Sequence, residues 1–150
     1  MNSQSEDELA GWFTTEGHAY RARIYYADTD FSGFVYHARY LEFLERGRSD
    51  YLRLAGIHHT ALAAGDQPLV WVVRKMEIEF MSPARMDDIV TVETVTEHIS
   101  GARIIMAQTM LRGDVCLISA KVEAAIVTPD GKPRRFPKDW STRLKPVATP

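Results

Sequence analysis

The chain has 150 residues, of which 45% are apolar and 25% charged, and it carries a formal net charge of -2. These values are typical of one soluble globular domain, and they exclude the strongly basic composition of nucleic-acid-binding proteins. No apolar run approaches the roughly 18 residues of a membrane span, and the polar, acidic N-terminus lacks the regions of a signal peptide. We therefore expect a cytoplasmic protein with no membrane span and no nucleic-acid partner.

The first predicted elements are an arm, a strand and a turn. Residues 1–17 are expected to form a mobile arm, in which Trp12 and Phe13 dock on the body or on a neighbouring subunit. The aromatic-rich residues 20–27 predict a strand. Residues 28–33, which include two Asp, a Thr, a Ser and a Gly, are typical of a turn.

A long helix is predicted for residues 37–55. Its apolar or small residues recur every three or four positions, at Tyr40, Leu44, Gly47, Tyr51 and Leu54. Gly56 stands where a helix of this length is expected to stop. Because Gly47 in a helix interior costs about 1 kcal/mol relative to Ala, we expect a strand or a partner helix to approach the backbone closely there.

Four strands are predicted after the helix, in residues 69–81, 89–97, 103–111 and 115–127. The first alternates, which places Val70, Val72, Met76, Ile78 and Phe80 on one face. Short turns join the strands, so the sheet is expected to be mostly antiparallel. A lone helix and a sheet must cover one another. We therefore predict an α+β domain over residues 18–137, a curved sheet around one central helix, followed by a frayed tail from 138 to 150.

Metal binding and disulfide formation have no support in the sequence. Cys116, the single cysteine, lies in an apolar run and is expected to be a small buried hydrophobe. His58 and His59 are adjacent, so their side chains diverge, and no acid or Cys at ligand spacing joins them. We predict no metal site.

The most informative segment carries two carboxylates, Asp28 and Asp30, where the predicted strand ends. If extended geometry persists, both lie on one side of the strand, and their repulsion raises the pKa of one of them. A carboxylate with a raised pKa suits general-base catalysis near neutral pH. The alternative is that Asp-Thr-Asp before a Gly is only turn chemistry.

The start of the predicted helix is also unusual. Phe34, Val35 and Tyr36 precede it, and no Ser, Thr, Asp or Asn stands in the adjacent capping position. The first backbone N–H groups of the helix are then free for a ligand oxygen. Such donors, at the positive end of the helix dipole, stabilise the oxyanion of acyl transfer.

Three segments, residues 25–46, 72–92 and 131–137, resemble in order and spacing the signature of the hot-dog acyl-CoA thioesterases. The similarity is to the 4-hydroxybenzoyl-CoA thioesterase family, and best to its Tol–Pal-associated branch. It covers about residues 20–137. It implies a hot-dog fold and hydrolysis of an acyl-CoA thioester to a free acid and coenzyme A, without a cofactor.

The resemblance also implies roles for individual residues. Asp30 is the expected catalytic carboxylate, acting as a general base or as a nucleophile, and the backbone N–H of His37 is expected to polarise the thioester carbonyl. The expected substrate-binding residues are Asp28, Gly33, Val35, Tyr36, Arg134 and Arg135. The two arginines are candidates for the phosphates of coenzyme A, or are an exposed solubilising pair. Ser32, Phe31 and Phe34 depart from the family pattern, which leaves the acyl group open.

The family implies a homo-oligomer, a dimer or tetramer, with active sites at subunit interfaces. Two other functions are weighed beside hydrolysis. A hot-dog hydratase or dehydratase needs a His–acid pair rather than a carboxylate before an uncapped helix. A non-catalytic acyl-CoA-binding or scaffold protein of envelope or lipid machinery would not require Asp30.

Overall fold

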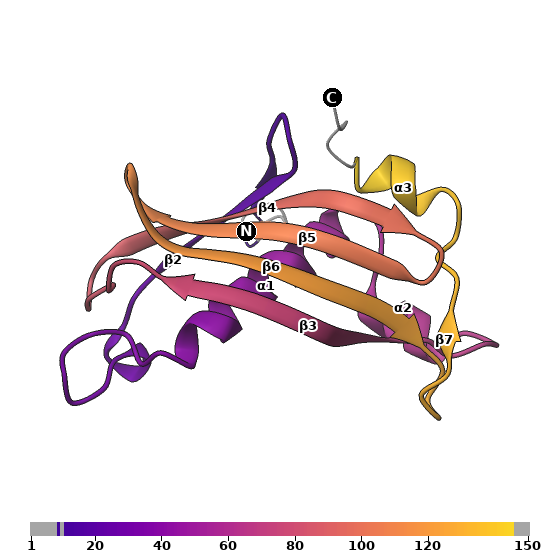
Figure 1. Cartoon of the computed structure of the whole chain (residues 1–150), viewed down its shortest axis with the longest axis horizontal. Coiled ribbons are helices and arrows are strands. Elements are labelled where there is room, and N and C mark those ends of the chain that lie inside the picture. Colours follow the sequence, from indigo (N-terminus) through magenta and orange to yellow (C-terminus); the bar gives the residue numbers. More distant parts are fainter. Residues whose placement is uncertain (1–8, 10, 146–150) are drawn as a thin grey trace, which may run out of the picture.

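The computed structural model describes residues 9 and 11–145 (Figure 1). Its elements in chain order are β1 (Trp12–Phe13), β2 (His18–Arg23), the 3-10 helix η2 (Tyr26–Asp28), α1 (Arg39–Leu54), α2 (His59–Ala64), β3 (Val70–Phe80), β4 (Ile89–Ser100), β5 (Arg103–Arg112), β6 (Val115–Val127), β7 (Pro133–Arg134) and α3 (Trp140–Arg143). Among these residues, seven strands form one antiparallel sheet in the order β1-β2-β4-β5-β6-β3, and β7 pairs with β6.

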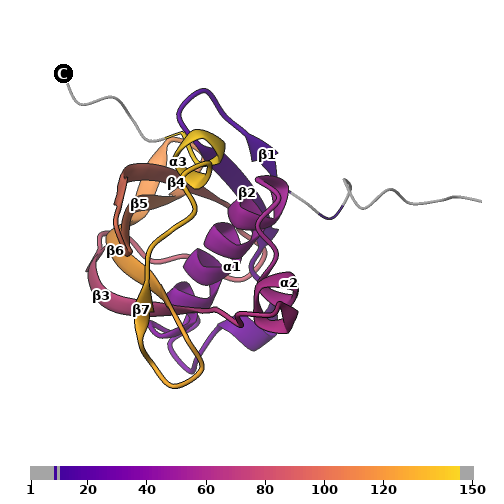
Figure 2. The same cartoon turned by 90° about the vertical axis from the view of Figure 1, so that its right-hand side faces the viewer.

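Helix α1 lies in the concave face of this sheet, and Figure 2 shows the strands curling around it. Its buried side is made by residues spaced three or four apart: Tyr40, Phe43, Leu44, Gly47, Tyr51 and Leu52. The sheet covers this apolar stripe, as the hydrophobic effect requires of an amphipathic helix. The predicted α+β arrangement of one long helix wrapped by a curved antiparallel sheet is thereby confirmed.

Gly47 explains how closely the helix approaches the sheet. A Cβ atom at this position would lie 2.7 Å from Val92 Cγ1, on β4. This distance is shorter than real Cβ contacts, so only Gly fits without a shift of the neighbouring side chain. The predicted close approach is confirmed, and the neighbour is a strand of the same chain.

The structure differs from the predicted strands in two places. β2 ends at Arg23, and η2 follows where extended backbone was expected. In β3 the pairing with β6 shifts between Val73 and Lys75, a β-bulge that reverses which face the side chains point to. Val70 and Val72 are therefore exposed, and the prediction that they share the inner face with Met76 and Ile78 is wrong.

The ends of the domain also differ from the predicted boundaries. β1 pairs with β2, so Trp12 and Phe13 dock on the body, whereas residues 1–8 and 10 of the expected arm lie outside the described part of the chain. α3 packs on the body where a frayed tail was expected, because Trp140 and Leu144 are buried on one face of this short helical turn. Residues 146–150 of that tail are not described.

His18 is a fully buried polar residue near the N-terminal end of β2. Its Nε2–H donates to Asp50 Oδ2 at 2.7 Å, and the same oxygen accepts the Gly11 N–H at 2.7 Å. Its Nδ1 is buried without a hydrogen-bond partner in the described residues. Protonation would place a donor there with no acceptor, which is costly. Burial accordingly lowers the pKa of His18, and the hydrogen bond to Asp50 offsets part of this effect.

We predict from this a loss of stability as the pH falls below about 6.5, the ordinary pKa of His. Below this pH, His18 binds a proton in the unfolded chain but not in the folded chain. The free energy of unfolding therefore decreases as the pH falls, until the pH reaches the pKa of His18 in the folded chain. Chemical denaturation between pH 7 and pH 5 measures this slope. His18→Gln, which removes the titrating group, is expected to flatten it. Equal slopes for the two proteins would contradict the prediction.

Candidate functional site

The segment between η2 and α1 folds into a tight loop over residues 29–35. Thr29 bridges to Val35, the Asp30 N–H donates to the Phe34 carbonyl at 3.0 Å, and the Gly33 N–H donates to the Asp30 carbonyl at 3.0 Å. Gly33 has a φ of 85°, a conformation that favours glycine. The loop is fixed to the body because the Val35 N–H donates to the Ala84 carbonyl at 2.9 Å.

The carboxylate of Asp30 is exposed and is held by Ser32. Its Oδ1 accepts the Ser32 hydroxyl at 2.5 Å and the Ser32 N–H at 2.8 Å. These two hydrogen bonds lower the pKa of Asp30, and the charge of the nearby His37 adds a smaller effect in the same direction. The expected increase of a carboxylate pKa by repulsion between Asp28 and Asp30 is therefore wrong for Asp30.

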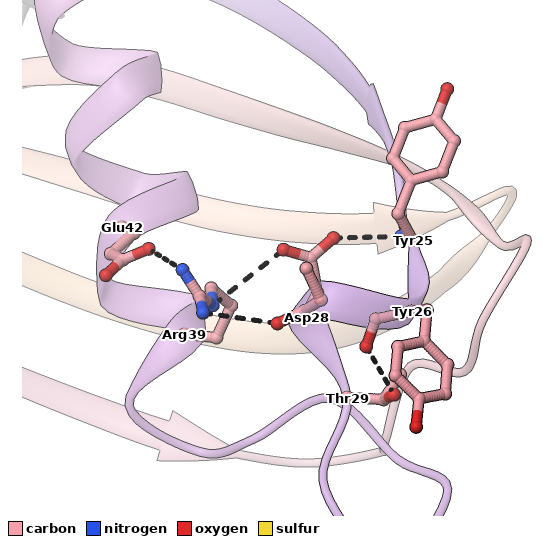
Figure 3. Close-up of polar contacts among 7 residues, drawn as sticks. Tyr25, Tyr26, Asp28, Thr29, Arg39 and Glu42 are labelled. Atoms are coloured by element: carbon pink, nitrogen blue, oxygen red, sulfur yellow. Dashed lines mark hydrogen bonds and ion pairs between the residues drawn. The ribbon is translucent and has the colours of Figure 1, made fainter.

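Asp28 makes separate contacts, which explains why it does not raise the pKa of Asp30. η2 replaces the extended backbone that would have aligned the two acids. Asp28 Oδ2 accepts the Tyr25 N–H at 2.8 Å, and its Oδ1 lies 3.8 Å from Arg39 Nε. Figure 3 shows Arg39 between Asp28 and Glu42. Asp28 thus stabilises the turn of η2, directly before the loop of Asp30.

The start of α1 has no side-chain cap, as predicted, but the helix begins at Arg39, two residues after the predicted start at His37. Ala38 occupies the N-cap position and makes no side-chain capping bond. Within the described residues, the backbone N–H of His37 makes no hydrogen bond. The His37 side chain is exposed, and its ring lies 4.6 Å from the ring of Tyr36. A free N–H and an exposed carboxylate therefore lie within one loop and helix start.

The remaining predicted residues fall into two groups. Val35 is buried in the core, whereas Tyr36 is about half exposed beside the loop. Arg134 and Arg135 line an open cavity of about 950 Å³ with Gln67 and Phe136. The structure thus brings Asp28, Gly33, Val35, Tyr36 and His37 close to Asp30, but not the two arginines.

Arg134 and Asp30 lie at opposite ends of the molecule, as Figure 1 shows for β7 and for the loop before α1. Arg134 pairs with Ile126, whose other neighbour is Trp71 near the start of β3. The Asp30 loop bridges to Arg85, just beyond the end of β3 at Phe80. At about 3.3 Å per residue, Trp71 and Phe80 are roughly 30 Å apart.

Two features of the site region were not predicted. Arg39 connects η2 to α1, because it contacts Glu42 at 2.5 Å and the Ala27 carbonyl at 3.2 Å; its i,i+3 spacing to Glu42 was the available signal. A largely apolar cavity of about 240 Å³ lies between α1 and β3. Across residues 9 and 11–145, no three His, Cys, Asp or Glu side chains gather in a way that could hold a metal ion.

Comparison with known proteins identifies the family of this chain. A sequence profile of the thioesterase superfamily matches residues 32–118. Acyl-CoA thioesterase YbgC of Haemophilus influenzae is 40% identical over 124 residues, which cover 82% of this chain and 90% of that protein. Acyl-CoA thioester hydrolase YbgC of Escherichia coli is 37% identical, over 82% of this chain and 92% of its own length. The crystal structure of a probable thioesterase from Bartonella henselae, 52% identical, superposes with a TM-score of 0.79 and covers 81% of this chain and 99% of its own.

The curved antiparallel sheet around one helix, together with the similarity to the structure from Bartonella henselae, defines a hot-dog protein. A loop with an exposed carboxylate precedes the uncapped helix start. The chain belongs to the thioesterase superfamily and is a thioester hydrolase. No helix in the described part of the chain is long and apolar enough to cross a membrane.

Proposed function

We propose that this protein hydrolyses an acyl-CoA thioester to a free carboxylic acid and coenzyme A, with Asp30 as the catalytic carboxylate. The observation that carries this proposal is that the exposed Asp30 carboxylate and the unbonded N–H of His37 lie within one loop and helix start. The carboxylate is ionised at neutral pH, as both a base and a nucleophile must be, although its lowered pKa makes it a weaker base than the predicted increase would have made it. The names of the relatives from Haemophilus influenzae and Escherichia coli support the choice of acyl-CoA.

In the proposed reaction, the thioester carbonyl oxygen accepts the N–H of His37 at the start of α1. As a general base, Asp30 removes a proton from water while the water oxygen bonds to the carbonyl carbon. The negative charge that develops on the carbonyl oxygen is stabilised by the N–H and by the helix dipole. The C–S bond then breaks, and coenzyme A leaves as a thiolate that takes up the proton. As a nucleophile, Asp30 would instead attack the carbonyl carbon and displace coenzyme A as a thiolate, and water would hydrolyse the resulting anhydride to the free acid and the restored Asp30 carboxylate.

The direct test is thiol release from a series of acyl-CoA substrates, short and long, aliphatic and aromatic, by the full-length protein. Hydrolysis of at least one substrate well above the rate of the free thioester supports the proposal. Binding of acyl-CoA without any thiol release would instead favour the non-catalytic role. The preferred substrate identifies the acyl group, which the sequence leaves open.

We propose that two copies of the chain pair through the outer edge of β3. In the described chain, β3 pairs with β6 on one side and has no strand on its other side. Val70, Val72 and Val73 are exposed along it, and an exposed apolar edge strand is a template for pairing. The apolar cavity between α1 and β3 opens beside the same strand.

A two-fold axis makes such a contact antiparallel and self-complementary. The Trp71 end of one β3 then lies beside the Phe80 end of the other. This pairing would place Arg134 and Arg135 of one subunit near the Asp30 of its partner, although β7 and the loop before α1 lie at opposite ends of one chain. The proposed dimer therefore reconciles the predicted phosphate-binding arginines with the predicted catalytic loop.

Val73→Lys tests this dimer. A lysine on an edge strand opposes pairing with another strand, and an unpaired charge in the contact costs about 3–5 kcal/mol, so we expect the variant to be monomeric and to lose acyl-CoA hydrolysis. Sedimentation velocity measures the oligomeric state. The matched control is Val115→Lys, because Val115 is equally apolar and exposed but begins β6 rather than an edge strand. Dimers in the Val73→Lys variant would contradict the proposed edge.

A further inference from the structure

A groove of about 390 Å³ lies between β2 and the first half of α1, near the opposite edge of the sheet from β3. Its walls carry four arginines: Arg21, Arg23, Arg39 and Arg46. The first two alternate along β2 with Tyr20 and Ala22, which pack against the core, so they lie on the exposed face of the strand and reach the groove at the open edge of the sheet. The other two are seven residues apart on α1, so they also share a face. Asp28 and Glu42 are the acidic residues of the groove, which leaves it a net charge of +2.

The groove exists because β1 is short. β1 reaches only His18 and Ala19 of β2. Within the described chain, the rest of β2, from Tyr20 onward, has no strand on that side. The groove lies between this open edge and α1, and Asp28 at the end of η2 is part of its lining. Figure 3 shows Asp28 beside Arg39, which also contacts Glu42.

Most of the positive charge in the groove is not matched by carboxylates. Arg39 contacts both acids, at 2.5 Å from Glu42 and 3.8 Å from Asp28. Arg21 lies over the ring of Trp12, with its Cζ 5.4 Å from the ring centroid. Arg23 donates to the Asp87 carbonyl at 2.9 Å.

Arg46 makes no hydrogen bond or ion pair within residues 9 and 11–145. Three guanidinium groups of the groove thus have no acidic partner in the described part of the chain. An unmatched charge of this size, held between two rigid elements, is available to an anionic ligand.

We infer that this groove binds a small molecule that carries a phosphate monoester or diphosphate. A phosphate group has a charge of about -1.5 to -2 at neutral pH, which matches the net charge of the groove. The planar donors of arginine match the geometry of phosphate oxygens, with two parallel N–H···O bonds. The site is separate from the arginines 134 and 135, which line a different cavity at the β7 end. It therefore adds a second anion site to the proposed active site.

The test is calorimetric titration of the full-length protein with inorganic pyrophosphate at low ionic strength. We expect saturable binding, and we expect the double variant Arg21→Ala, Arg46→Ala to bind at least about tenfold more weakly, since a charge-assisted hydrogen bond contributes about 1.5–3 kcal/mol. Both side chains are exposed, and circular dichroism checks the fold of the variant. The charge-matched control is the double variant Arg103→Ala, Lys121→Ala, two exposed cations that are paired with Glu123 and Glu97 on the sheet surface.

The outcomes separate the alternatives. Absence of pyrophosphate binding by the parent protein, or equal affinity in the double variant, would overturn the inference. The same titrations with coenzyme A, on the groove variant and on Arg134→Ala, Arg135→Ala, identify the source of the phosphate. If binding of coenzyme A is weakened only in Arg134→Ala, Arg135→Ala, the groove binds a different phosphorylated molecule. If Arg21→Ala, Arg46→Ala also weakens the binding of coenzyme A, the ligand of the groove is coenzyme A itself. Thioester hydrolysis, measured in parallel, reports on the active site independently.

Discussion

Asp30→Asn is expected to lower kcat/KM for acyl-CoA hydrolysis by about 10²- to 10⁴-fold, the contribution that a positioned acid or base typically makes. Asn retains the shape of the side chain, and its carbonyl oxygen still accepts the hydrogen bonds that Ser32 donates to Asp30. It has no negative charge, so it neither removes a proton from water nor attacks a carbonyl carbon. Thiol release at neutral pH, with the best acyl-CoA substrate of the parent protein, measures the loss.

The control for this prediction is Asp28→Asn, two residues earlier in the same segment. Asp28 is engaged by the Tyr25 N–H and by Arg39, and it stabilises η2 rather than facing solvent beside His37. Its replacement is therefore expected to cost much less activity than the replacement of Asp30. If Asp28→Asn caused the larger loss, or if Asp30→Asn retained parental activity, Asp30 would not be the catalytic carboxylate.

The sequence predicted those elements whose side-chain pattern is repeated over many residues. The stripe on α1 recurs over four turns, and β6 was predicted with its exact bounds, Val115–Val127. The interior Gly47 was also informative, because a glycine in a helix needs a physical reason, and Val92 supplies it. A pattern that repeats over many residues remains recognisable when single residues break it, so these predictions were correct despite local irregularities.

The features that could not be predicted depend on single contacts between distant segments. The bulge at Arg74 is set by the pairing of β3 with β6, which no local pattern in β3 records. The pKa of Asp30 depends on whether the strand before it continues, and on the rotamer of Ser32. The separation of Asp30 from Arg134 follows from the topology of the whole sheet. The chemical types of the site residues were thus readable in the sequence, but not their arrangement.

Trp140→Ala is expected to decrease the free energy of unfolding by about 3–5 kcal/mol, the range for removing a large aromatic side chain from a core. Trp140 is only 5% exposed. Its ring stacks on Trp71 of β3 at 5.7 Å and contacts Phe136 at 5.6 Å. One turn later Leu144 is fully buried, and its carbonyl accepts the Tyr51 hydroxyl of α1 at 2.5 Å. The C-terminal segment therefore joins the strand to the helix, and the cavity left by Trp140 would weaken both contacts.

Urea unfolding followed by circular dichroism measures this loss, with Trp12→Ala as the matched control. Trp12 is also a tryptophan, but it is about half exposed on β1, where it contacts Arg21. Its removal leaves no core cavity, so we expect a cost of less than about 1 kcal/mol. Equal destabilisation by the two substitutions would mean that residues 138–145 contribute no more than a surface strand does. The larger loss for Trp140→Ala would extend the cooperative domain beyond the predicted boundary at residue 137, because only residues that unfold with the core contribute to the unfolding free energy.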